Sequence, residues 1–124
     1  MSIFLARVAG VAGKVVAFEP SWPMYMAMCA IIQSNVDCKA PIFTVPFGLA
    51  ECEKTANLNV PHGDFGMGSL AQPEAWGRVH PRSELSQHEC RFISLDGFLR
   101  SKEGLEADFW KIDVEGAELY VLRG

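Results

Sequence analysis

The sequence predicts an α/β fold with an open, mainly parallel sheet, in one domain covering residues 1–124. Residues 15–19 and 42–45 are short apolar runs of the kind that form buried strands. Between them, apolar residues recur at helical spacing over residues 22–34, which makes a strand–helix–strand unit. Such a unit predicts a parallel crossover. A further apolar run over residues 109–113 repeats the form of the first strand.

The start of the chain predicts a helix end, a turn and a strand. Residues 2–9 are expected to close a helix, and Gly10 and Gly13 break the pattern before the strand begins. Pro20 stops that strand because proline has no N–H to donate to a ladder. Ser21 then stands where the N-cap of the next helix belongs.

The middle of the chain predicts short elements around a long polar stretch. Alternation over residues 55–60 predicts a half-buried strand, followed by a glycine-rich loop over 61–68. Residues 72–87 are polar and interrupted by proline and glycine, so we expect a mobile or substrate-facing loop. A short strand over 91–93 and a helical turn over 94–99 come next.

The end of the chain predicts a second strand that presents an acid. The run 109–113 ends in Asp113 as the first strand ends in Glu19, and a helix over 116–122 follows, with Gly124 at its C-cap. Ligands of open α/β sheets bind beyond the carboxyl ends of strands, where an acid commonly holds a ribose. Glu19 and Asp113 therefore predict a nucleotide-like ligand, and solvated strand ends are the alternative.

Composition excludes several function classes. The formal net charge of −4, without blocks of like charge, argues against a nucleic-acid partner. The four cysteines lack C-x-x-C spacing and no histidine completes a quartet, so we expect no metal site, reduced thiols and a cytoplasmic location. The longest uncharged run, residues 20–36, is too short and polar for a membrane span.

A glycine-rich loop normally precedes a ribose-binding acid by about 20 residues. Counting back from Glu19 passes Met1, so we expect that loop, and the central strand feeding it, upstream of this chain. A chain that folds without this strand exposes a parallel edge, which pairs with other chains. We therefore expect dimerisation or aggregation through the exposed sheet edge.

Several blocks resemble the FkbM-family methyltransferases in order and interval. The most specific reads Lys-Ile-Asp-Val-Glu-Gly-Ala-Glu. The matching blocks are Val15–Pro20, Phe47–Gly48, Gly68–Leu70, Ile93–Leu99 and Lys111–Glu118. The family's aspartate–glycine–alanine–asparagine type of loop has no counterpart here, so the resemblance is to a partial domain that lacks the N-terminal glycine-loop motif.

The resemblance implies an incomplete Rossmann-like class I methyltransferase sheet, with an antiparallel insertion between the third and fourth family strands. It implies S-adenosylmethionine as cofactor and methyl transfer to a hydroxyl of a sugar, glycan or natural product. Glu19 would hold the ribose hydroxyls of the cofactor. Phe18, Pro20, Phe47 and Gly48 would border the adenine.

The same resemblance assigns the reacting end to the last block. Asp113 would lie by the methionine end of the cofactor. Glu115 would lie near the reacting centre or would tie the following loop in place. Two alternatives stay open: a non-catalytic domain of this fold that serves as a binding or assembly module, and another nucleotide-binding α/β protein of dehydrogenase type. The block at residues 111–118 weighs against the latter.

Overall fold

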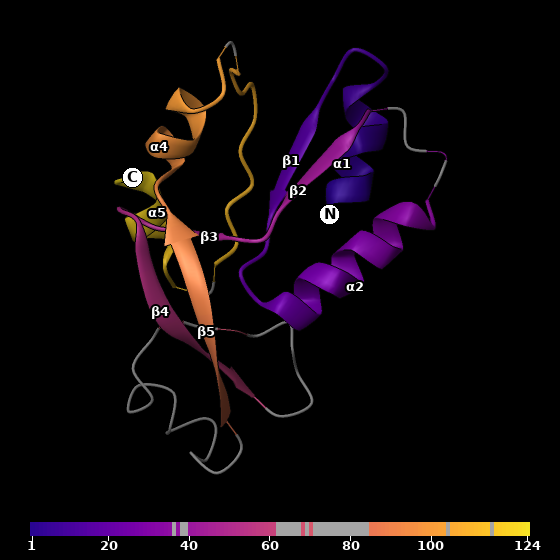
Figure 1. The fold of residues 1–124 in the computed structure, drawn as a ribbon. Coiled ribbons are helices and arrows are strands. Elements are labelled where there is room, and N and C mark those ends of the chain that lie inside the picture. Colours follow the sequence, from indigo (N-terminus) through magenta and orange to yellow (C-terminus); the bar gives the residue numbers. More distant parts are fainter. Residues whose placement is uncertain are drawn as a thin grey trace. The chain divides into compact units, whose positions relative to one another are not determined.

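Where the structure describes it, the chain forms an α/β fold with two sheets (Figure 1). The computed structural model describes residues 1–35, 37, 40–61, 68, 70, 85–103, 105–114 and 116–124. These residues divide into two compact units, an N-terminal unit, Met1–Pro46, and a C-terminal unit, Phe47–Gly124.

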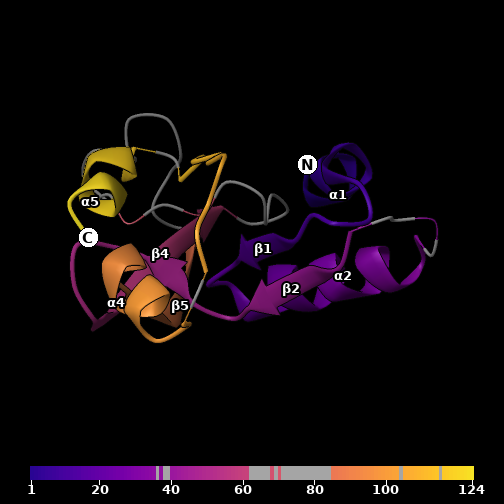
Figure 2. The same ribbon diagram turned by 90° about the horizontal axis from the view of Figure 1, so that it is seen from above.

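The N-terminal unit is the predicted strand–helix–strand motif with a helix before it. Its elements are α1 (Ser2–Ala9), β1 (Val15–Phe18), α2 (Trp22–Gln33) and β2 (Ile42–Val45). The two strands run side by side in both ribbon views (Figure 2) and pair in parallel. The predicted strands, helix and parallel pairing are confirmed, with bounds that differ by at most one residue.

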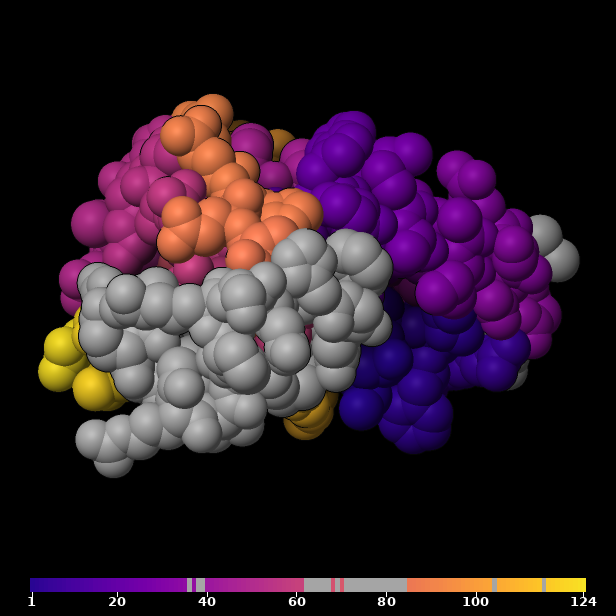
Figure 3. All heavy atoms as spheres, turned by 90° about the horizontal axis from the view of Figure 1, so that it is seen from below, coloured from indigo at the N-terminus to yellow at the C-terminus, as the bar shows by residue number. Residues whose placement is uncertain are grey.

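Small side chains let the elements of this unit approach closely. Ala6, Ala17 and Ala40 are buried. The N–H of Ala40 donates to the carbonyl of Ala6 over 3.2 Å, which joins the end of the α2–β2 connection to α1. Side chains of α2 form part of the surface in Figure 3, and large apolar residues on it such as Trp22 and Ile31 are exposed.

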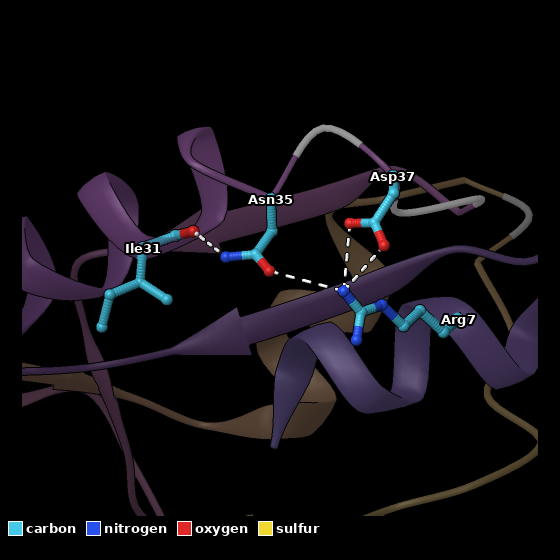
Figure 4. Close-up of polar contacts among 4 residues, drawn as sticks. All are labelled: Arg7, Ile31, Asn35 and Asp37. Carbon is cyan, nitrogen blue, oxygen red and sulfur yellow. Dashed lines mark hydrogen bonds and ion pairs between the residues drawn. The ribbon is translucent and has the colours of Figure 1, made fainter.

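A polar cluster also ties α1 to the α2–β2 connection (Figure 4). Nη2 of Arg7 contacts the two carboxylate oxygens of Asp37 over 3.0 and 2.8 Å, and it donates to Oδ1 of Asn35 over 3.5 Å. Asn35 in turn donates to the carbonyl of Ile31, in the last turn of α2. The Arg7 guanidinium lowers the pKa of Asp37. The cluster is exposed, so it fixes geometry more than it stabilises the fold.

The C-terminal unit contains a mixed three-stranded sheet. Its strands are β3 (Gly48–Leu49), β4 (Lys54–Pro61) and β5 (Leu85–Ile93), in the order β3-β5-β4. β5 pairs in parallel with β3 and antiparallel with β4. Among the described residues after β5, two short helices follow, α4 (Leu95–Arg100) and α5 (Glu118–Leu122).

One apolar cluster forms the core of this unit. Its buried members come from β4, β5 and the residue after β3: Ala50, Leu58, Val60, Cys90 and Phe92. Ala56 and Leu70 pack against them. Cys90 is thus a buried thiol, and Cys38 lies outside the described residues.

The polar stretch before residue 91 is shorter than predicted. Residues 85–87 belong to β5, so the predicted strand 91–93 is only its last part. The alternating burial along β5 explains the error, because its polar side chains lie on the exposed face while the backbone pairs with β4. Most of the predicted loops 61–68 and 72–87 lies outside the described residues.

The predicted second strand, residues 109–113, is wrong. Within the described part of the chain this segment pairs with no strand, and Phe109 and Trp110 are 66% and 45% exposed. A strand requires a neighbour for its N–H and C=O groups, and apolar content alone supplies none. Asp113 therefore follows an irregular segment rather than a strand tip. α5 begins at Glu118 and its C-cap is Arg123, where Gly124 was predicted.

Candidate functional site

Glu19 lies where β1 ends. Its N–H donates to the carbonyl of Val45 over 3.1 Å, which extends the β1–β2 ladder by one residue. Pro20 then ends the strand, and the chain turns back so that the N–H of Ser21 donates to Oε1 of Glu19 over 2.8 Å. The local sequence thus fixes both the backbone and the side chain of this acid.

The environment of Glu19 is unusual for a carboxylate. Burial raises its pKa, and the hydrogen bond from the Ser21 N–H works in the opposite direction. A carboxylate has about four acceptor sites, and Ser21 occupies one of them. Additional O–H donors would stabilise the charged form, so the group is suited to bind a vicinal diol.

The neighbours of Glu19 add apolar surface and one buried hydroxyl. Phe18 and Pro20 are half-buried on either side of it. Ser21 is 1% exposed, and within the described part of the chain its Oγ has no hydrogen-bond partner. It occupies the N-cap of α2 with extended backbone angles but forms no side-chain cap hydrogen bond, and Pro23 follows it in the first turn.

Phe47 and Gly48 are held by β5 in the C-terminal unit. The guanidinium of Arg91 lies over the Phe47 ring, 5.0 Å from its centroid, and Arg91 also pairs with Glu53. Gly48 is buried in β3 and is in register with Phe92. Arg91 thus orients the aromatic ring. This contact spans 44 residues of sequence, and no local pattern could have predicted it.

Asp113 is an open carboxylate beside a lysine. Its side chain is 73% exposed, and Oδ2 lies 2.9 Å from Nζ of Lys111. The two are separated by one residue, so this ion pair is a local contact within the segment. Glu115 lies outside the described residues.

The turn after Asp113 is held by Glu118. Oε1 of Glu118 accepts hydrogen bonds from the N–H of Val114 over 3.4 Å and of Gly116 over 3.2 Å. Its pKa is lowered first by its own N–H and then by that of Gly116. No role for Glu118 was predicted from the sequence, and its signal was an acid in the first helical turn, two residues after Gly116.

The described residues contain neither a cluster of metal ligands nor a helix that could span a membrane. Among these residues no three His, Cys, Asp or Glu side chains gather to hold a metal ion. None of the helices seen there has the length and apolarity to cross a bilayer. Three of the cysteines, Cys29, Cys52 and Cys90, are free thiols.

Comparison with known families decides the class of the chain. The model of the methyltransferase FkbM domain matches residues 2–124. The chain belongs to the FkbM methyltransferase family. No curated protein and no solved structure matched it.

Membership of the FkbM family confirms the resemblance that the blocks of the sequence suggested. Its model covers both units, and the observed α/β architecture with mixed sheets agrees with an incomplete methyltransferase fold. Phe18, Glu19 and Pro20 lie in the N-terminal unit, while Phe47, Gly48 and Asp113 lie in the C-terminal unit. Their individual roles, and their convergence on one ligand, stay predictions.

Proposed function

We propose that this FkbM-family chain binds S-adenosylmethionine and transfers its methyl group to a hydroxyl oxygen of a sugar, glycan or natural-product acceptor. The observation that carries the proposal is the family match over residues 2–124 together with the half-buried Glu19 carboxylate after β1.

The described residues fit the adenosyl part of this cofactor. Glu19 offers acceptor sites for the two ribose hydroxyls, and the charge-assisted bonds are stronger than neutral ones. Phe18 and Pro20 adjoin it, and the Phe47 ring that Arg91 orients offers a flat apolar surface for the adenine.

We assign the reacting end of the cofactor to the last matching block, Lys111–Glu118. When bound, the cofactor supplies an electrophilic methyl group on a positively charged sulfur. Asp113 attracts that charge and holds the methionine end. We assign Glu115 either to the reacting centre or to the loop beside it, as the family resemblance suggests.

The protein contributes orientation above all. The acceptor oxygen must lie in line with the methyl–sulfur bond, and correct alignment supplies much of the rate. Transfer would join the acceptor oxygen to the methyl carbon, leave the bonding electron pair on the sulfur and release the hydroxyl proton to a base or to water.

Titration calorimetry of the full chain with S-adenosylmethionine tests cofactor binding. We expect saturable binding that Glu19→Ala weakens at least about tenfold, since hydrogen bonds to a charged group are worth such a factor. Glu103→Ala removes an exposed acid far along the chain and is the matched control. Absence of heat at millimolar cofactor would reject the proposal and favour the non-catalytic binding module.

Transfer is tested with cofactor carrying a labelled methyl group and a panel of sugars, saccharides and hydroxylated natural products. We expect label in the acceptor and, in the same reaction, demethylated cofactor in equal amount. The panel contains no amino or thiol acceptors, so any label must lie on a hydroxyl-bearing compound. A chain that binds the cofactor but labels none of these acceptors would leave O-methylation unsupported.

We further propose self-association through the edge of β1 and action in the cytoplasm. Within the Met1–Pro46 unit, β1 pairs with β2 on one side, and strand edges of this kind pair with other chains. The cysteines that the structure describes are reduced, which suits a reducing compartment.

A further inference from the structure

The segment that follows Asp113 is fixed by a single carboxylate. Glu118 Oε1 accepts from the N–H groups of Val114 and Gly116, over 3.4 and 3.2 Å. The N–H of Ala117 donates to the carbonyl of Val114 over 3.2 Å and closes the turn. The residue after Asp113 is therefore bonded through both its N–H and its C=O.

These bonds limit how Asp113 can move. The Val114 N–H belongs to the same peptide group as the Asp113 carbonyl, so a bond to it fixes the plane of that peptide. Gly116 has φ of 91°, a conformation that other residues adopt only with strain. Gly116 permits this turn, and Glu118 holds it through the N–H groups of Val114 and Gly116.

Charge supports the same arrangement. The backbone N–H groups of Glu118, Gly116 and Val114 lower the pKa of Glu118, in that order, against repulsion from Asp113. Glu118 is thus charged at neutral pH, when it accepts most strongly. Lys111 Nζ lies 2.9 Å from Asp113 Oδ2 and so restrains the side-chain carboxylate of Asp113.

We propose that Glu118 is a positioning residue that holds the backbone of Asp113 so that its carboxylate meets the methionine end of the cofactor. The proposal rests on the proposed function, in which Asp113 holds that end. Glu118 contacts the turn, and it acts on the cofactor only through Asp113.

Amide hydrogen exchange tests, without any cofactor, whether Glu118 holds the turn after Asp113. In Glu118→Ala we expect the Val114 and Gly116 amides to exchange about fivefold faster or more, the factor that a typical hydrogen bond is worth. Amides of β5 should keep their wild-type rates. Unchanged exchange at Val114 and Gly116, or equal acceleration along β5, overturns the proposal, because either result means that Glu118 does not act on this turn specifically.

Calorimetric titration with S-adenosylmethionine tests whether Glu118, through Asp113, contributes to cofactor binding. We expect Glu118→Ala to weaken binding about fivefold, Glu118→Gln to fall between it and the wild type because the amide oxygen still accepts, and Glu106→Ala to bind as wild type. Glu106 is an exposed acid of the same unit.

The outcomes separate this proposal from the one on which it rests. A wild-type chain that binds no cofactor rejects the proposed function and this role together, while exchange still decides whether Glu118 holds the turn. A wild-type chain that binds, with Glu118→Ala equally tight, overturns the positioning role alone.

Discussion

At the scale of single residues, Glu19 combines two opposing requirements. Its position after β1 buries the carboxylate and raises its pKa, which disfavours the charge that a ribose diol needs. The hydrogen bond from the Ser21 N–H offsets part of this effect. Such a conflict between stability and a charged group is typical of binding sites.

This conflict predicts a pH-dependent gain of stability in Glu19→Gln. Because the folded pKa is raised, the folded state binds more protons than the unfolded one, and wild-type stability falls as pH rises from the unfolded through the folded value. At pH 7.5 we expect Glu19→Gln to raise the free energy of unfolding by less than about 1 kcal/mol, since partial exposure screens the effect.

Urea unfolding at pH 3.5 and pH 7.5 measures the difference. At the lower pH, where the wild-type carboxyl is largely protonated, the two proteins should unfold at nearly the same urea concentration. Glu103→Gln, which removes an exposed acid, is the control. A Glu19→Gln variant that is less stable than wild type at pH 7.5 would contradict the prediction.

At the scale of elements, the N-cap of α4 is the clearest local signal. Ser94 has extended backbone angles, and its Oγ accepts from the N–H of Gly97 over 3.0 Å. We expect Ser94→Ala to lower the free energy of unfolding by about 1 kcal/mol, the usual value of a serine cap. Chemical denaturation of the full chain measures it.

Ser101→Ala provides a comparison at the other end of α4. The Ser101 hydroxyl donates to the carbonyl of Phe98 over 2.7 Å on an exposed surface, where water can replace it. This variant should therefore lose less than Ser94→Ala. Equal losses would show that the cap adds nothing beyond an ordinary exposed hydrogen bond.

Elements whose signals are local were predictable from the sequence. The Pro20 stop, the helical turn expected over 94–99 and the helix expected over 22–34 depend on neighbours a few positions away. The structure has β1 ending at Phe18, α4 over Leu95–Arg100 and α2 over Trp22–Gln33. The run 109–113 is also largely apolar, but a strand depends on a partner backbone that no local pattern reports.

The same distinction between local signals and distant partners applies to the candidate site. Glu19 was predictable because a strand end and a proline mark it. The Arg91 contact with Phe47 was not, since it depends on β5 extending back to Leu85 and on its register with β3.

At the scale of the whole molecule, two small sheets leave strand edges to be satisfied. In the N-terminal unit, the N–H groups of Val15 and Glu19 donate to β2 and to the residue before it. Since successive N–H groups along a strand alternate in direction, the Val16 N–H points away from β2. A second chain that pairs with β1 would accept from it.

Val16→Pro therefore tests self-association without touching the β1–β2 ladder. Proline removes the Val16 donor and is tolerated on an edge strand. We expect sedimentation equilibrium to show a wild-type mass that rises with concentration and a Val16→Pro mass that stays near one chain, with matching far-UV circular dichroism.

Val11→Pro is the control, because Val11 is the second residue of the turn closed by the Gly13 N–H and the Gly10 carbonyl, where proline is favoured. It should associate as wild type. A wild-type chain that stays monomeric at high concentration would contradict association through this edge, and a Val16→Pro variant that associates normally would assign it to another surface.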